Sequence, residues 1–417
     1  TQRQLYEFLQ EQNSQLWMDA TGSSPDSSLV GNTLERGFGH TPYGDRFANV
    51  CGLEVILPTG ELIHTGFGRF HNAQTSSVYR WGVGAYLDGL FSQSNFGIVT
   101  KMTIWLMPAP EYFQAFYFSI AQESQLAEAI DALRPLRLNG TIKSAVHLGN
   151  SYKVLSSIRQ YPWAEAQGTT PLSPELMNYF AQTWNFGAWN GSGGLYGTKK
   201  QVAEARRLIK QALKGKVKKL QFLDNRTLAI APYLAKPYQL LTGLNLPEML
   251  KLIKPVYGLM KGIPTDTQLK STYWRKKFAP PEQMNPDRDK CGLLWCAPVA
   301  PLEGKQAIAI AQIATLTTLE HQFEPLISMT ILTERCLGCV IAIAFDREVP
   351  GEDERALNCY YDLSQQLNQA GYYPYRLGIQ SMDTLKSSED SYHHLLSRLK
   401  EALDPNQILA PGRYLNL

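Results

Sequence analysis

Two patterns of hydrophobic and polar residues follow one another along the chain and predict a mixture of helices and strands. Apolar residues three and four apart share one face of a helix, and this spacing occurs at 4–19, 123–134, 201–213, 304–319, 353–370 and 391–403. Runs rich in β-branched and aromatic residues predict strands at 102–107, 115–120, 181–195, 292–298, 326–332 and 340–345, with a hairpin at 51–66. Strand, helix and strand follow in this order twice, which predicts an antiparallel sheet backed by helices.

Residues 28–45, SLVGNTLERGFGHTPYGD, fit neither pattern. Glycine is used where the backbone takes positive φ or comes close to a ligand, and this segment has glycines at positions 31, 37, 39 and 44. Asp45 follows a Pro-Tyr-Gly turn, so it is a candidate general base or the start of an Asx turn. Taken alone, a surface connection is the commoner explanation of such a loop.

Composition indicates an ordinary globular protein without an argument for nucleic acid or membrane partners. The 417 residues are 44% hydrophobic and 18% charged, with a net charge of +3. The basic run 206–219 has apolar residues at helical spacing and is interpreted as a solvated helix face. Apolar runs reach about half of the roughly 20 residues that span a bilayer. Six irregularly spaced cysteines predict a reducing compartment, and we expect a cytoplasmic location.

The familiar short motifs of metal, nucleotide and hydrolase chemistry are absent from the sequence. Cys336 and Cys339 form one CxxC pair, which cannot complete a tetrahedral zinc site, and no histidine spacing matches a zinc motif. We therefore predict no metal. There is no GxGxxG after a strand, no P-loop and no GxSxG nucleophile elbow.

Tyr375 and Arg376 form a second candidate for chemistry. A phenol hydroxyl beside a guanidinium can bind an anionic oxygen, because the cation donates hydrogen bonds and favours the charged form. The alternative is an ordinary strand start whose arginine pairs with a surface carboxylate.

A series of motifs resembles the vanillyl-alcohol oxidase and p-cresol methylhydroxylase family, whose members use FAD to oxidise 4-substituted phenols. The motifs are TPYGD at 41–45, LDGLFSQSNFGIVTK at 87–101, WLMP at 105–108, YR at 375–376 and DPNQILAPGRY at 404–414, with RPLRL at 134–138 and GIPT at 262–265. They occur in the family's order, and the resemblance covers nearly the whole chain.

The resemblance implies an α+β fold: the C-terminal part of a p-cresol methylhydroxylase-type FAD-binding domain, plus an α+β cap domain with an antiparallel sheet. It divides the chain into 1–144, the second half of the FAD-binding domain, 145–371, the cap or substrate domain, and 372–417, a C-terminal return to the FAD-binding domain. The pattern of the sequence itself changes earlier, after Glu111, where alternating strand and helix segments with few long loops begin.

The resemblance also implies a reaction and a set of site residues. Hydride passes from the benzylic carbon of the phenol to flavin N5 and leaves a p-quinone methide. Tyr375 and Arg376 would stabilise the phenolate, and Asp45 would be the acid or base near N5. The residues expected to line FAD are Thr41, Pro42, Tyr43, Gly44, Gly97, Ile98, Val99 and Arg413.

The covalent flavin link is one departure from the family. Its members use His or Tyr just before the strand at 340–345, where this sequence has Cys339, or Cys336 if the register differs. A cysteinyl link to the 8α-methyl group is an alternative, because a thiolate is a strong nucleophile. No base can be named beside the thiol, so we expect non-covalent FAD.

The start of the chain is the other departure. Family members have a further segment before the point that matches Thr1, holding the loop for the FAD pyrophosphate. We therefore expect a complementary N-terminal fragment or chain, together with an aromatic small-molecule substrate and a homodimer. A non-catalytic binding or assembly subunit remains an alternative. So does an oxidase of a non-phenolic substrate, because segment 232–263, interpreted as a lid or buried loop, has no clear family counterpart.

Overall fold

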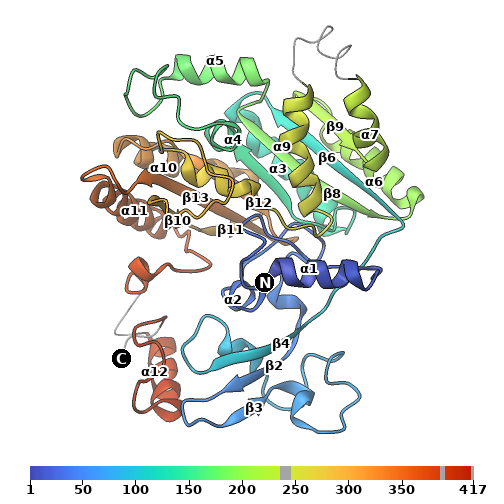
Figure 1. Cartoon of the computed structure of the whole chain (residues 1–417), viewed down its shortest axis with the longest axis vertical. Coiled ribbons are helices and arrows are strands. Elements are labelled where there is room, and N and C mark those ends of the chain that lie inside the picture. The colour runs from blue at the N-terminus through green and yellow to red at the C-terminus, as the bar shows by residue number, and fades with distance from the viewer. Residues whose placement is uncertain (235–245, 386–389, 415–417) are drawn as a thin grey trace.

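The chain forms a large upper body and a smaller lower body (Figure 1). This computed structural model describes residues 1–234, 246–385 and 390–414. The segment interpreted as a lid, 232–263, lies partly outside the described residues; its later part is helix α9 (Leu246–Leu259). Within the described ranges, no helix is long and apolar enough to cross a membrane.

The upper body is built on one antiparallel sheet. Its strand order is β10-β13-β12-β7-β8-β6-β9, with β11 paired to β13. The strands are β6 (Tyr112–Ile120), β7 (Val146–Asn150), β8 (Trp189–Gly197), β9 (Lys219–Leu223), β10 (Cys291–Cys296), β11 (Val299–Pro301), β12 (Leu326–Ile331) and β13 (Cys336–Asp346). The antiparallel sheet predicted from the sequence is thus confirmed.

Helices cover both faces of this sheet. One face packs against α3 (Leu126–Leu138), α6 (Lys199–Ala212), α10 (Gly304–Glu320) and α11 (Glu352–Gln369), and this interface is the main hydrophobic core. On the other face, α4 (Ser151–Ile158) and α5 (Pro174–Trp184) cover one part, while α7 (Asn225–Ile230) and α9 cover another. The rest of that face looks toward the lower body (Figure 1).

The strand predicted at 181–195 is wrong in its first half. Residues up to Trp184 belong to α5, which Asn185 ends in the left-handed conformation, and β8 begins only at Trp189. β8 is glycine-rich because aromatic rings of β6 lie over it: a Cβ on Gly191 would stand 2.2 Å from the Phe118 ring. Its glycines therefore mark a close approach rather than a loop.

The lower body combines strands from the first quarter of the chain with a helix from its C-terminal part. It contains the sheet β3-β2-β4, formed by β2 (Val50–Ile56), β3 (Leu62–His64) and β4 (Ile98–Ile104). Helix α12 (Ser391–Leu403) packs on this sheet through Leu396, Leu399 and Leu403, beside the buried Val55 and Phe96. The C-terminal helix thus lies against the lower sheet, and the assignment of 372–417 to the FAD-binding domain stays a prediction.

The N-terminal segment lies between the two bodies (Figure 1). The helix predicted at 4–19 is shorter and earlier, α1 (Gln2–Glu11), and is followed by β1 (Leu16–Trp17), which pairs with β5 (Met107–Pro108). α2 (Leu29–Leu34) opens the glycine-rich segment. The prediction extended the helix too far because Leu16 continues the helical spacing.

The domain boundary at residue 144 stays a prediction, and we propose an earlier one. β6 begins at Tyr112 and pairs along its whole length with β8 of the upper sheet, while α3 packs on the same sheet. Residues 112–138 therefore share the upper core. A boundary at Glu111, where the pattern of the sequence changes, fits this packing.

A buried ion pair holds the C-terminal segment against the lower body. Lys400 is 2% exposed, and its Nζ donates to Asp404 Oδ2 at 2.6 Å, to the Asn95 carbonyl at 2.7 Å and to the Leu409 carbonyl at 3.1 Å. Asp404 also accepts the backbone N–H groups of Ile408 and Leu409. All donors of the ammonium are thus satisfied.

Replacing Lys400 with Met should destabilise the lower body. The variant leaves the Asp404 carboxylate buried without its cation, and breaking a buried pair in this way costs about 3–5 kcal/mol. Thermal unfolding followed by circular dichroism measures the effect. Lys251→Met is the matched control, because the Lys251–Glu248 pair is on the surface and such pairs contribute roughly 0–1 kcal/mol. Equal melting temperatures for the two variants would contradict the assignment.

Candidate active site

Hydrogen bonds from one polar turn bring together the motifs that carry the family resemblance. Gln93 donates its backbone N–H to the Leu34 carbonyl at 3.0 Å and its side-chain amide to the Tyr375 carbonyl at 2.9 Å. Asn95 donates to the Ala410 carbonyl at 3.1 Å. The glycine-rich segment, the 92–97 turn, the Tyr-Arg pair and the C-terminal motif therefore meet at one place.

An aromatic cluster lies between the two bodies at this place. The Phe38 ring centroid is 5.7 Å from that of Tyr375 and 6.5 Å from that of His147, and the His40 and His147 rings stack at 4.1 Å. Phe38 and His40 come from the glycine-rich segment, His147 from β7 of the upper sheet, and Tyr375 from the segment after α11. The cluster thus joins both bodies across the face of the sheet that looks down.

The two histidines are neutral side chains in this cluster. Burial lowers the pKa of His40, and it lowers the pKa of His147 well below its usual value, with repulsion from His40 as the next cause. His40 Nδ1 lies 3.2 Å from the Ala20 carbonyl, which can only accept, so this nitrogen carries the hydrogen. His147 Nδ1 lies 3.0 Å from Thr330 Oγ1, whereas its buried Nε2 makes no hydrogen bond of normal geometry.

A buried carboxylate that the sequence analysis did not single out lies behind the loop. Asp19 is 6% exposed at its side chain, and its Oδ1 accepts the backbone N–H of Thr41 at 2.9 Å and the Thr41 hydroxyl at 2.7 Å. Its Oδ2 accepts Arg46 Nε at 2.9 Å. Asp19 also faces His40 closely enough to raise the pKa of that imidazole against the effect of burial. The loop 39–46 is therefore fixed around this carboxylate.

Asp45 is in a different setting. Its side chain is exposed, and its Oδ1 accepts the backbone N–H of Ala48, three residues on, at 3.2 Å, a local turn bond one residue longer than the Asx turn weighed as the alternative. Its backbone forms a bridge to Phe38. The predicted base is thus beside the aromatic cluster through its backbone, while its carboxylate closes a turn.

Tyr375 and Arg376 lie together as the prediction requires. The Arg376 guanidinium stacks 5.4 Å from the centroid of the Tyr375 ring and 5.4 Å from that of Trp295. Burial raises the pKa of Tyr375, and the Arg376 charge opposes that increase. Arg376 lines a cavity of about 350 Å³ together with Arg413, which is paired with Glu35. Both arginines predicted from the C-terminal half therefore meet at this cavity.

The predicted cofactor residues belong to closely packed backbone. Gly39 and Gly44 close a tight loop through a 2.9 Å hydrogen bond, and a Cβ on Gly44 would stand 2.9 Å from the Gly39 carbonyl oxygen. Thr41 is buried, while Pro42 and Tyr43 are partly exposed at the turn. A loop so compact presents backbone rather than side chains to a neighbour.

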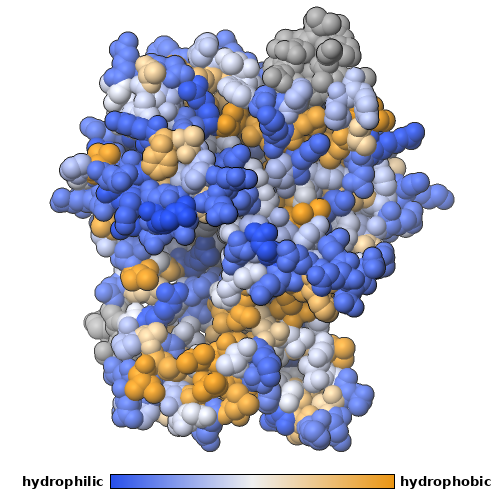
Figure 2. Space-filling view, in the orientation of Figure 1, coloured by the Kyte–Doolittle hydropathy of each residue, from blue (hydrophilic) through white to orange (hydrophobic). Residues whose placement is uncertain are grey.

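The start of β4 suits a flat, largely apolar cofactor. A Cβ on Gly97 would stand 2.6 Å from Val55, the next side chain, Ile98, is 53% exposed, and Val99 is partly buried in the cluster beneath. Apolar colour gathers over the lower body in Figure 2, where large apolar side chains are exposed: Leu62, Phe70, Val78, Trp81, Val83 and Ile98. Of these, Ile98 belongs to the backbone predicted to line FAD, where it offers an apolar side chain to a flat ring. The residues present therefore fit FAD.

The cysteines give the covalent alternative little support. Cys339 is fully buried in the core between the sheet and α10 and α11, and burial raises the pKa of its thiol. It lies opposite Met329, whereas Gly338 lies opposite Thr330, so the thiol is on the other face of the sheet from His147. Cys336 shares the face of Gly338, yet burial raises its pKa as well. In the described ranges, no group of His, Cys, Asp or Glu is arranged to hold a metal.

Comparisons with known proteins identify the cofactor domain and the relatives of the chain. Residues 1–66 match the model of the FAD binding domain. The chain is 47% identical over 415 residues to 1'-carboxy-chondrochloren decarboxylase of Chondromyces crocatus, covering 99% of this chain and 76% of that protein. It is 31% identical over 414 residues to the 4-cresol dehydrogenase [hydroxylating] flavoprotein subunit of Pseudomonas putida, covering 98% and 72%.

A solved structure has the same fold. The crystal structure of p-cresol methylhydroxylase with substrate bound superposes with a TM-score of 0.86 at 29% identity, over 100% of this chain and 75% of that chain. Fold and sequence together define an FAD-dependent oxidoreductase. The chain belongs to the vanillyl-alcohol oxidase and p-cresol methylhydroxylase family. The homodimer, the complementary N-terminal fragment and the cytoplasmic location stay predictions.

Proposed function

We propose that the chain oxidises a 4-substituted phenol at its benzylic carbon. The observation that carries this proposal is the partly buried Tyr375 ring, which contacts the Phe38 ring and lies under the Arg376 guanidinium. A phenol hydroxyl beside a fixed cation stabilises a phenolate oxygen. Bound FAD supplies the chemistry of a hydride acceptor, and the loop at 41–44, residues 97–99 and Arg413 are the residues that would hold it.

Replacing Tyr375 with Phe tests the phenolate role. Losing one preorganised donor to a developing oxyanion lowers rates by roughly 10²–10³-fold, so anaerobic flavin reduction by 4-ethylphenol should slow by about that factor. Tyr373→Phe is the matched control. The Tyr373 side chain is 54% exposed, so this variant should reduce the flavin at an unchanged rate. Unchanged reduction in the Tyr375 variant would refute the proposal.

Two carboxylates compete for the acid or base role. The family resemblance nominates Asp45, whose carboxylate is exposed and closes a turn. Burial, and proximity to His40 and to the loop 39–44, favour Asp19. We propose Asp19 as the carboxylate that holds or moves the proton, because it faces the histidine pair from a dry position.

The variants Asp19→Asn and Asp45→Asn separate these two. General acid or base catalysis contributes roughly 10²–10⁴-fold, so Asp19→Asn should lower kcat for 4-ethylphenol by at least about 100-fold. Asp45→Asn should stay within about threefold. Because Asp19 also pairs with Arg46, the melting temperature is measured too: a loss of kcat accompanied by a lower melting temperature would indicate a purely structural role. The reverse ranking of the variants would return the role to Asp45.

Oxidative decarboxylation is a second candidate function. The relative at 47% identity is a decarboxylase of a carboxylated compound. If the carbon next to the benzylic carbon carries a carboxylate, loss of hydride first leaves a quinone methide. Breakage of the C–COO⁻ bond then supplies the electron pair that forms the C=C bond and restores the phenolate, and carbon dioxide leaves. This sequence needs no oxidant beyond the FAD of the parent reaction.

The histidine pair suits such a substrate. In the tautomer in which Thr330 donates to Nδ1, His147 carries its hydrogen on Nε2, and a substrate carboxylate that replaced the backbone of Gly39 as neighbour would accept it. Because burial keeps both imidazoles neutral, the carboxylate is oriented without a countercharge. A carboxylate in dry surroundings without a countercharge is destabilised, which favours its loss as neutral carbon dioxide.

3-(4-Hydroxyphenyl)propanoate tests the second candidate. The FAD-loaded protein should release one carbon dioxide per flavin reduced and form 4-vinylphenol, measured by trapping the gas and by chromatography. His147→Phe, which removes the donor, should lower this rate at least about tenfold while 4-ethylphenol oxidation changes by less than about threefold. Flavin reduction without release of carbon dioxide would refute oxidative decarboxylation and would still support phenol oxidation.

A further inference from the structure

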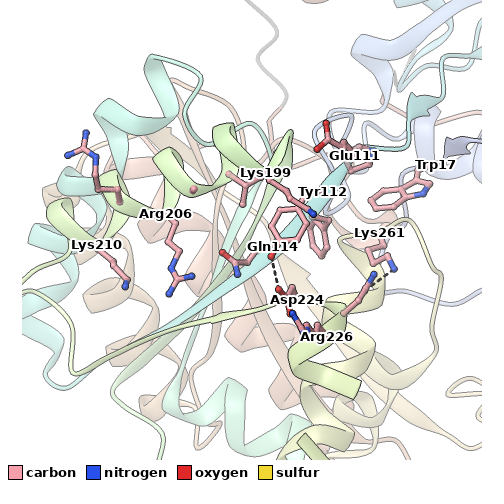
Figure 3. Close-up of a pocket in the computed structure, with 16 residues that line it drawn as sticks. Trp17, Glu111, Tyr112, Gln114, Lys199, Arg206, Lys210, Asp224, Arg226 and Lys261 are labelled. Carbon is pink, nitrogen blue, oxygen red and sulfur yellow. Dashed lines mark hydrogen bonds between the residues drawn. The ribbon is translucent and has the colours of Figure 1, made fainter. Parts of the chain in front are cut away.

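A second cavity lies away from the aromatic cluster, at the far edge of the upper sheet (Figure 3). It is a cleft of about 810 Å³, within the roughly 300–1,000 Å³ of small-molecule sites. Its walls are α6 on one side and the start of α7 with Lys261 on the other, and its floor is the beginning of β6. It shares no lining residue with the cavity that holds Arg376 and Arg413.

The cleft exists because two neighbouring strands differ in length. β9 ends at Leu223, opposite Ala115, so residues 112–114 of β6 have no partner on that side of the sheet. The chain then turns into α7, whose N-cap is Asp224. The open edge of β6, with Tyr112 and Gln114, becomes the floor between the two walls (Figure 3).

Positive charge dominates the lining. The cations are Lys199, Arg206, Arg207, Lys210, Arg226 and Lys261, and the carboxylates are Glu111 and Asp224. Asp224 is already engaged by the Tyr112 hydroxyl at 2.6 Å and by the Thr227 N–H at 2.7 Å. Glu111 is exposed at the rim and points away from Arg206 in Figure 3. Neither carboxylate neutralises the cations.

Most of these cations have no ionic partner in the chain. Arg207 pairs with Glu204, but in the part of the chain that the structure describes, Lys199, Arg206, Lys210 and Arg226 make no ion pair. Arg206 and Lys210 both stand over the Phe222 ring, at 5.1 and 5.9 Å. The ring thus positions the two charged ends, and both side chains line the cleft.

The first turn of α6 adds to the same field. A helix N-terminus carries partial positive charge and is usually followed by acidic residues. Here the first turn has no acidic residue and begins with Lys199 and Lys200. Lys199 points over Tyr112 in Figure 3. Such an arrangement is favourable only when an anion is close by.

Aromatic side chains supply the other half of a binding surface. The Trp17 ring stands at one end of the cleft, with Lys261 Nζ 5.7 Å from its centroid, and Tyr112 lies in the floor. We propose that this cleft is a second binding site, for an organic phosphate or diphosphate ester whose anionic group meets the α6 cations and whose organic part lies against Trp17 and Tyr112. A concave site with ring faces matches a small ligand better than an acidic protein surface.

Binding of inorganic pyrophosphate to the FAD-loaded protein tests the site by titration calorimetry at low salt. The double variant R206Q/K210Q should weaken the Kd at least about tenfold, because it removes two cations that make charge-assisted hydrogen bonds to the anion. K214Q/K218Q is the matched control: it removes equal charge from exposed lysines that do not line the cleft. Its Kd should stay within about twofold. Arg226→Gln, from the opposite wall, should also weaken binding.

Three results would overturn the proposal: no saturable binding, equal weakening in the control variant, or displacement of pyrophosphate by poly-glutamate at lower concentration, which would indicate an acidic protein partner. Oxidation of 4-ethylphenol should be unchanged in R206Q/K210Q. Failure of the proposed anion site can therefore be distinguished from failure of the proposed phenol oxidation.

Discussion

The buried pair between Arg46 and Asp19 is the constraint on which the site depends. Arg46 is 5% exposed and donates to Asp19 Oδ2, to the Asp19 carbonyl at 2.7 Å, to Gln2 Oε1 at 3.0 Å and to Asn32 Oδ1 at 3.2 Å. One guanidinium thus ties α1, the segment after β1, α2 and the glycine-rich loop together. A buried arginine is tolerable only when its donors are satisfied, so these segments cannot move independently, and the loop that carries Phe38 and His40 keeps one position.

Most of the fold could be predicted because its elements are locally consistent. The hairpin at 51–66 has strong strand residues around a Pro-Thr-Gly turn, and the helices at 304–319 and 353–370 have long apolar faces. The errors came where tertiary packing overrides local pattern. β8 is full of glycine because the rings of β6 lie over it, and the first helix stops at Glu11 because Leu16 and Trp17 pair with β5. No local pattern carries either fact.

The site was harder to predict than the fold. Tyr375 and Arg376 could be nominated because adjacent residues of unusual chemistry stand out, and the structure stacks them. Asp19 and His147 could not be nominated from the sequence, since each acquires its surroundings only from a distant partner: Asp19 from Thr41 and Arg46, His147 from His40 across the two bodies. Asp45 was nominated by its motif, but its carboxylate closes a turn. Burial and pairing across the fold, which spacing does not encode, separate the two carboxylates.

The return of the C-terminal segment to the lower body sets an order of events during synthesis. The bond from Lys400 to the Asn95 carbonyl joins residues 305 apart, and the one from Gln93 to the Tyr375 carbonyl joins residues 282 apart. At about 5–20 residues per second, a ribosome needs roughly 15–60 s to supply the later partner. The β2–β4 sheet is therefore synthesised well before the helix α12 that covers it. The strands of the upper sheet are closer together in the sequence, so they can pair earlier. Docking of α12 on the lower sheet is therefore a late step in folding.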